Sequence, residues 1–329
     1  MFAWGSGNIG RLGDGTTTSK SSPVQIGSSS WSVVLASGGA VSLAIRSDNI
    51  LFAWGRGATY GSQGVGDRIA RSSPAQVGGV PGNFDVSSPI QVGSSSWTAV
   101  SAGTYHVVAI DSNYKLFTWG RNTGGQLGDG TTTDRSSPVQ IGSSSWTAVS
   151  AGLSHTVAIR SDGGLFAWGA GPDGSFNSRG QLGDGILFSS RSSPIQIGTN
   201  SWTIVSSGGR HTAGISNNLL YTWGDGTGGQ RGDGATTSQI ASPSLVGNNN
   251  VAADNRSSPV QVGTSSWTAV SCGRDHAGAI TSNSKLYAWG TNTYGQLGQN
   301  NIVSSLTPVQ VGTRSWTLFS AGDRRSIAV

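Results

Sequence analysis

The sequence has 329 residues, and its formal net charge of +5 is spread along the chain, which is too dilute to indicate a nucleic-acid-binding protein. Only 11% of the residues are charged, and all 15 acidic residues are aspartate. A chain that is poor in Lys and Glu but rich in Gly, Ser, Thr and Val is poor material for helices and favours an all-β protein.

The first ten residues show no basic region followed by an apolar run, so we expect no signal peptide. No apolar run is long enough to span a membrane, so we expect no membrane insertion. The single cysteine, Cys272, excludes an internal disulfide and stands where other repeats carry Ala, which predicts a buried core residue. The compartment stays open, with a virion or an extracellular surface as a guess.

A repeat of about 50 residues runs along the whole chain and uses all 12 tryptophans. Each copy opens on a Trp, and a Trp-Gly pair follows 21 to 23 residues later. The opening residues are Trp31, Trp97, Trp146, Trp202, Trp267 and Trp316. The residues of the Trp-Gly pairs are Trp4, Trp54, Trp119, Trp168, Trp223 and Trp289. A repeat of this length indicates a solenoid or a propeller.

One copy shows the four strands that each repeat predicts. Residues 146–152 form a first strand of small residues, which suits the crowded axis of a propeller. Residues 155–159 and 165–169 form the second and third strands, joined by a Ser-Asp-Gly-Gly hairpin turn. Residues 193–198 form a fourth strand, whose Pro places it at the outer edge.

These strands predict one all-β domain over residues 1–329, a closed β-propeller of six four-stranded antiparallel blades. Residues 1–5 have the pattern of a third strand, and residues 326–329 that of a second strand. We therefore expect the two ends to share one blade and to close the ring, which removes exposed strand edges. The tryptophans are expected to pack between blades.

The repeats resemble those of the regulator of chromosome condensation family. The matching segments are Ala151 to Ile159, the Asp-Gly turn, Leu-Phe-Ala-Trp-Gly, Gly125 to Gly130 and Ser-Ser-Pro-Val-Gln-Ile. The resemblance covers essentially the whole chain and implies a propeller, usually of seven blades, whereas six units are found here. Family members differ widely in function: a chromatin-bound exchange factor for a small GTPase, a plant ultraviolet-B photoreceptor and a secreted β-lactamase inhibitor. Gly209 replaces the Trp of the photoreceptor's Gly-Trp-Arg-His-Thr motif, which argues against photoreception.

Two recurring polar residues are candidates for chemistry. Four histidines share one repeat position: His106, His155, His211 and His276. Equivalent positions in different blades lie too far apart to hold one metal ion, so we favour histidines bonded to backbone over a metal ring. Four Gly-Asp-Gly turns carry Asp14, Asp129, Asp184 and Asp233. Each offers one carboxylate, whereas calcium takes six to eight oxygens, so a turn is favoured over weak cation binding. No cofactor and no catalytic group are predicted.

Large length variation falls between the Trp-Gly pair and the next opening Trp, which we assign to the third-to-fourth-strand connection. The insertions lie within roughly residues 57–86, 170–190 and 225–255. In a four-stranded antiparallel blade these loops share a face with the Ala-Gly-x-x-His loops, so a binding site is expected there. Candidate contact residues are Tyr60, Arg68, Phe84, Phe176, Arg179, Phe188, Arg210, Arg274 and Arg324. The sequence fits loop residues without a binding role equally well. Asp275 and Asp323 lie near these arginines in the sequence and could neutralise their charge.

We therefore expect a non-enzymatic scaffold that recognises a protein or glycan through this face. It could be a virion or cell-surface component, or a subunit of a larger assembly. The alternatives are a regulatory propeller acting on a small GTPase or chromatin, as the resemblance implies, and a secreted protein inhibitor. A glycan lyase or hydrolase is disfavoured, because without Glu only Asp could supply paired carboxylates.

Overall fold

The computed structural model describes residues 2–5, 10, 12–36, 41–56, 85–169, 180–186, 190–234, 239–245, 265–323 and 326–329. These residues form 23 β-strands, and no α-helix occurs among them. All strand pairs are antiparallel, as predicted from the sequence. Within the same ranges, no helical segment has the length and apolarity needed to cross a bilayer.

Three blades are complete four-stranded sheets whose spatial order follows the sequence. The first contains β10 (Trp146–Ala151), β11 (His155–Arg160), β12 (Leu165–Gly169) and β13 (Arg191–Gln196). The second contains β14 (Ile204–Ser207), β15 (His211–Ser216), β16 (Leu219–Asp225) and β17 (Gln239–Leu245). The third contains β18 (Trp267–Cys272), β19 (His276–Thr281), β20 (Leu286–Gly290) and β21 (Ser305–Gln310).

Two further blades share one long strand. They contain β3 (Trp31–Ala36), β4 (Val41–Arg46), β5 (Ile50–Arg56), β6 (Asp85–Ala102), β7 (His106–Asp111), β8 (Leu116–Gly120) and β9 (Arg135–Gln140). Strand β6 pairs with β5 through its first part and with β7 through its last part. It is therefore the outermost strand of one blade and the innermost strand of the next.

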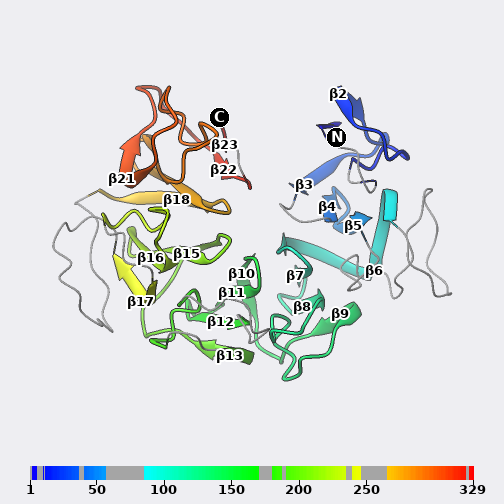
Figure 1. Ribbon diagram of the computed structural model, residues 1–329. Coiled ribbons are helices and arrows are strands. Elements are labelled where there is room, and N and C mark those ends of the chain that lie inside the picture. The colour runs from blue at the N-terminus through cyan, green and yellow to red at the C-terminus, as the bar shows by residue number, and fades with distance from the viewer. Residues whose placement is uncertain are drawn as a thin grey trace.

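The first strand of each blade lies at the axis, as predicted. Figure 1 shows the blades following one another around a centre that is surrounded by inner strands such as β10 and β22 (Phe319–Ala321). Residues of five inner strands and the turns after them line one axial cavity of about 380 Å³. Its wall is made of small residues such as Ser101, Ala102 and Gly103, which let neighbouring backbones approach closely.

Closure of the ring stays a prediction. The two ends form separate two-stranded sheets, β1 (Phe2–Gly5) with β2 (Lys20–Gln25), and β22 with β23 (Ser326–Ala328). Among the described residues no strand pairing joins β23 to β1, and Figure 1 shows the two ends standing apart.

The structure corrects the placement of one insertion. Strand β17 pairs with β16 in the register that the other outermost strands use, so its own Ser-Pro segment (Ser242, Pro243) forms the edge of that blade. Residues 246–264 therefore follow the fourth strand in the chain rather than precede it, and they lie outside the described residues. The sequence between β5 and β7 holds two Ser-Pro segments, Ser73-Pro74 and Ser88-Pro89. In the β5–β6 pair the second of them lies at the edge, so the insertion there precedes the fourth strand, as predicted.

The tryptophans pack within and between blades, as expected. Trp168 is fully buried, and the centroid of its ring lies 6.3 Å from that of Trp146 in the same blade. Its Nε1 donates to the carbonyl of Gln126 in the preceding blade at 3.0 Å. Trp223 and Trp289 make the same inter-blade hydrogen bond. A glycine faces each of these rings, since any larger residue would place its Cβ too close to the indole. At Gly128, for example, a Cβ would lie 2.7 Å from the Trp168 Nε1 atom.

Candidate functional site

The four histidines lie at the joints between blades, where three of them tie one blade to the next. His106 Nε2 lies 2.9 Å from Thr156 Oγ1, His155 Nε2 lies 3.0 Å from Thr212 Oγ1, and His276 Nε2 lies 2.9 Å from Ser326 Oγ. The expectation of a backbone partner is wrong for these three histidines, because each ring bonds to a hydroxyl of the following blade instead. A histidine of one repeat and a hydroxyl of the next therefore act as one structural unit.

The hydrogen-bond directions fix the histidine tautomer. The hydroxyl of Thr156 donates its single proton to the carbonyl of Gln126 at 2.8 Å, so it must accept a proton from Nε2 of His106. The Nδ1 atom of His106 is then an unprotonated buried acceptor without a hydrogen-bond partner. Burial lowers the pKa of His106 to about 4 and the pKa of His155 to about 3, so both rings are neutral at pH 7.

His211 is the exception to this arrangement. Its side chain is fully buried, and neither ring nitrogen has a hydrogen-bond partner. The residue that occupies the hydroxyl position in the next blade is Ala277, which has no donor or acceptor in its side chain. The carbonyl of Gln230 keeps only the indole of Trp289 among the two donors that its counterparts receive.

Replacing Ala277 with Thr is expected to stabilise the protein by about 1 kcal/mol, the usual net value of one buried hydrogen bond. The new hydroxyl would accept from His211 and donate to Gln230, as Thr156 does in its own blade. Urea unfolding of Ala277→Thr and of the isosteric Ala277→Val measures the gain. An equal change in both variants would mean that packing, not the hydrogen bond, is responsible.

Two more sets of hydrogen bonds tie the blades around the axis. The hydroxyl oxygens of inner-strand serines accept from backbone amides of the next blade: Ser101 from Ala151, Ser150 from Ser207, Ser206 from Cys272 and Ser271 from Ala321. In the turns that follow these strands, a backbone amide of one blade donates to a backbone carbonyl of the next. The pairs are Leu153 to Gly209, Gly209 to Arg274 and Arg274 to Gly322. Hydrogen bonds between consecutive blades therefore fix the positions of the turns around the mouth of the axial cavity.

The face around this mouth, which we call the loop face, combines two kinds of loop. It carries the first-to-second-strand loops (residues 152–154, 208–210, 273–275 and 322–323) and the third-to-fourth-strand loops (residues 121–134, 226–234 and 291–304). The two kinds are joined by backbone hydrogen bonds, from Asp225 to Arg210 and from Thr291 to Asp275, both at 2.9 Å. The prediction that both loop types share one face is therefore confirmed.

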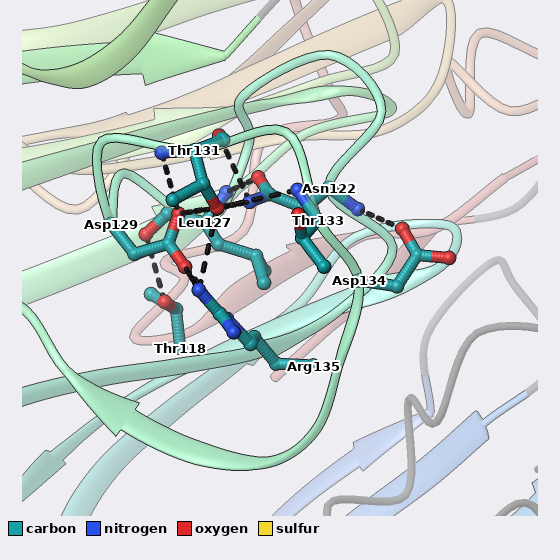
Figure 2. A network of polar contacts seen from close by, with 8 residues as sticks. All are labelled: Thr118, Asn122, Leu127, Asp129, Thr131, Thr133, Asp134 and Arg135. Atoms are coloured by element: carbon teal, nitrogen blue, oxygen red, sulfur yellow. Dashed lines mark hydrogen bonds and ion pairs between the residues drawn. The ribbon is translucent and has the colours of Figure 1, made fainter.

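The Gly-Asp-Gly turns brace the third-to-fourth-strand loops from inside. Figure 2 shows Asp129 at the centre of one such network. Its Oδ1 accepts from the backbone and hydroxyl of Thr131 and from the Asn122 amide, and its Oδ2 pairs with Arg135. These bonds hold the pKa of Asp129 below its usual range although burial opposes them. A carboxylate already bonded to four donors is a poor cation ligand, which favours the structural interpretation of these turns.

One buried charge, Arg231, was not among the residues predicted from the sequence. Arg231 is fully buried in the position where other blades place Leu127, Leu182 or Leu297. Its Nε atom lies 2.9 Å from Asp233 Oδ2, and its Nη1 donates to the Gly224 carbonyl. Burial lowers the pKa of Arg231, while Asp233 opposes that shift. The replacement of Leu by Arg beside a Gly-Asp-Gly aspartate was visible in the repeat alignment and is the signal that could have revealed the pair.

Two of the candidate contact residues lie within the described part of the chain, Arg210 and Arg274. Arg274 is 55% exposed, and its guanidinium lies 3.5 Å from Asp275 and 3.6 Å from Asp323. The structure thus brings three charges from two neighbouring loops together at the mouth of the axial cavity. The remaining candidates lie outside the described residues: Tyr60, Arg68, Phe84, Phe176, Arg179, Phe188 and Arg324.

The described residues hold no group of three or more His, Cys, Asp or Glu side chains that could bind a metal ion. Cys272 is buried beside the axial cavity, and burial raises the pKa of its thiol to about 12, so the thiol is not a nucleophile at neutral pH.

Comparison with known sequences finds one family. The model of the regulator of chromosome condensation (RCC1) repeat matches residues 1–45, 115–159, 217–280 and 283–329, and a second model of this repeat matches residues 97–126, 146–181 and 267–296. The ultraviolet-B receptor UVR8 of Arabidopsis thaliana is 30% identical over 306 residues, which are 91% of this chain and 62% of that protein. The E3 ubiquitin-protein ligase HERC2 of Homo sapiens is 30% identical over 135 residues, 40% of this chain and 2% of that protein. This chain thus spans less than two thirds of either relative.

Comparison with solved structures finds the same architecture. Human WBSCR16 matches with a TM-score of 0.77 at 18% identity, over 99% of this chain and 80% of that one. Prp20p of Saccharomyces cerevisiae, which is described as binding Gsp1p and histones, matches with a TM-score of 0.77 at 18% identity, over 99% of this chain and 77% of that one. At these identities the likeness shows the fold alone.

Proposed function

This chain belongs to the regulator of chromosome condensation repeat family, and we propose that it is a non-enzymatic propeller that binds a protein partner through its loop face. The observation that carries the proposal is the belt of backbone hydrogen bonds that joins the loops of successive blades around the cavity mouth. A surface held in place before binding loses little conformational entropy when a partner docks, which favours affinity.

The charged residues at the cavity mouth support a protein partner. Arg274 is half-exposed, and its two carboxylate neighbours lie at 3.5 and 3.6 Å, distances typical of loose, solvent-screened pairs. Such an arginine can exchange these partners for a carboxylate or a carbonyl of a docking protein, with its planar guanidinium as a bidentate donor. Arginine is also among the residues enriched in protein interfaces.

Replacing Arg274 with Ala is expected to weaken partner binding by about tenfold, the cost of about 1.4 kcal/mol at an interface arginine. The matched control is Lys115→Ala, which removes one positive charge from the turn between β7 and β8 on the opposite face. Both variants serve as bait in native extract, and the protein that co-purifies with the wild-type chain is quantified. Equal losses with both variants would show a general charge effect and would contradict a site on the loop face.

A glycan is the second ligand class compatible with an exposed loop surface. A glycan array probed with the wild-type chain and with Arg274→Ala separates the two classes, because the proposal of a protein partner expects no glycan signal that depends on Arg274. Placement on a virion or cell surface, or within a larger assembly, belongs to the same proposal and is tested by imaging the native particle or extract by electron microscopy.

The fold shared with Prp20p supports one alternative, a regulatory propeller that acts on a small GTPase or on chromatin. Prp20p is described as binding Gsp1p and histones, and a similar partner here would also be a protein. Binding of purified Gsp1p and of histones is measured at low salt, where charge-based association is strongest. Absence of both interactions would remove this alternative and leave the broader proposal in place.

A further inference from the structure

One of the four joints that contain a histidine differs from the other three in its side-chain oxygen. In those three, a hydroxyl accepts from the histidine of the preceding blade and donates to a glutamine carbonyl, at distances between 2.8 and 3.0 Å. The hydroxyl belongs to Thr156, Thr212 or Ser326, so the oxygen recurs and the methyl group does not. At the fourth joint the same position is Ala277.

The backbone at this fourth joint keeps the spacing of the others. The Ser206 hydroxyl accepts from the Cys272 amide at 2.9 Å, and the corresponding distances at the neighbouring joints are 2.8 and 3.0 Å. Trp289 Nε1 lies 3.0 Å from the Gln230 carbonyl, against 3.0 and 2.9 Å for the equivalent pairs. The two blades have therefore not moved together to fill the space that a threonine side chain takes elsewhere.

The ring of His211 has the same orientation as the other histidine rings. A Cβ at Gly208 would lie 2.2 Å from its Cε1 and 2.6 Å from its Nδ1, and a Cβ at Gly152 would lie 2.1 and 2.5 Å from the same atoms of His155. One edge of each ring is thus packed against a glycine, and the Nε2 edge faces the next blade. At His211, Nε2 and the Gln230 carbonyl therefore face the position that a hydroxyl takes at the other joints.

We propose that one buried water molecule binds at this position, between His211 of one blade and Ala277 of the next. It accepts the Nε2 proton of His211 and donates to the Gln230 carbonyl, which are the two hydrogen bonds that Thr156 makes at its own joint. A water takes up about 30 Å³ in the liquid and needs two to four polar partners when it is buried. Threonine exceeds alanine by two heavy atoms, which is enough space for one water oxygen.

Other ways of satisfying the His211 ring are disfavoured. Cys272, the strand partner of Ala277, makes no hydrogen bond to it. Burial is the main cause of the low pKa of His211, and the charges of His276 and Arg231 lower it further, so a cation at the same ring is disfavoured. An uncharged ligand fits better, and a buried donor without an acceptor usually costs more free energy than immobilising one water.

The test changes the number of buried waters in both directions. Ala277→Ser supplies the oxygen that Ser326 supplies at its own joint and should remove one long-lived internal water, whereas Thr156→Ala should add one. Magnetic relaxation dispersion of ¹⁷O in the solvent counts such waters, and crystal structures of the same variants locate them. An unchanged count in Ala277→Ser would overturn the proposal. An unchanged count in Thr156→Ala would mean that a joint without the hydroxyl takes up no water, which also contradicts it.

The ring nitrogen of His211 gives an independent readout. In protein with ¹⁵N-labelled histidine, its Nε2 resonance, assigned by its loss in His211→Gln, should have the shift of a hydrogen-bonded N–H in the wild-type chain and in Ala277→Ser. Ala277→Val fills the space without supplying an oxygen, so the resonance should move to the shift of an N–H without an acceptor. Equal Nε2 shifts in the wild-type chain and in Ala277→Val would overturn the bound water.

Discussion

Lowering the pH from 6.5 to 4.5 is expected to remove much of the folding stability of this protein. Burial lowers the pKa of His106 and His276 to about 4 and that of His155 and His211 to about 3. In the unfolded chain these rings titrate near 6.5, so between pH 4 and 6.5 the unfolded state binds more protons than the native state. Their contribution is fully present above pH 6.5 and is lost as the pH falls.

The size of this loss is set by the number of histidines. Each buried ring contributes a slope of up to about 1.4 kcal/mol per pH unit, so four approach about 5 kcal/mol per pH unit. Because the chain has no Glu and Asp residues titrate mainly below pH 4.5 in the unfolded chain, carboxylates add little to the slope above that pH. Urea unfolding at pH 7, 6, 5 and 4.5 gives the slope directly.

His211→Gln provides the control for the acid response. Since neither ring nitrogen of His211 has a hydrogen-bond partner, this substitution removes one titrating group without breaking an inter-blade hydrogen bond. The slope of the free energy of unfolding against pH should fall by the contribution of one proton, about 1.4 kcal/mol per pH unit. A free energy of unfolding that stays constant between pH 4.5 and 6.5 would contradict neutral buried histidines at the blade joints.

Replacing Trp168 with Ala is expected to cost about 3–5 kcal/mol, the usual range for a buried Trp truncated to Ala. The side chain is fully buried, packs against Trp146 and donates to the carbonyl of Gln126 in the preceding blade. The loss combines a cavity at a blade joint with one of the two hydrogen bonds that the Gln126 carbonyl accepts, since the Thr156 hydroxyl still donates to it. Urea unfolding measures it, and Trp168→Phe separates the hydrogen bond from most of the packing.

A double-mutant cycle tests whether Trp168 acts across the joint. Gly128→Ala is strained by its positive φ of 76° and by the Trp168 ring at 2.7 Å from the new Cβ. In the Trp168→Ala background only the backbone strain remains, so the penalty of Gly128→Ala should shrink. Equal penalties in both backgrounds would mean that the two residues do not contact each other.

The repeat pattern was sufficient to predict the blades because it places both the innermost and the outermost strand of each one. Small residues after the opening Trp require a close approach at the axis, and the Ser-Pro segment requires an edge. The structure places the Trp146 strand at the axis and the Arg191–Gln196 strand at the outside, as predicted. The same reasoning failed for the insertion near β17, because the sequence there holds two similar Ser-Pro segments, Ser242-Pro243 and Ser258-Pro259, and does not show which of them forms the edge strand.

The joints between blades could not be predicted from one repeat at a time. His106 and Thr156 are 50 positions apart, and their contact depends on how two blades pack. The shared position of the histidines was visible in the sequence, but the backbone partner expected for them was wrong. The hydroxyl of the next repeat recurs just as regularly, and its absence at Ala277 becomes meaningful only once the joint is known.

The most direct test of the binding proposal compares two exposed tyrosines on opposite faces. Tyr294 is 62% exposed in a third-to-fourth-strand loop of the loop face, and Tyr114 is 58% exposed in a turn between second and third strands. A photo-cross-linking aromatic residue is placed at each position, and cross-linked proteins are identified after irradiation in native extract. We expect a specific adduct at position 294 and none at position 114. An adduct only at position 114 would contradict binding through the loop face.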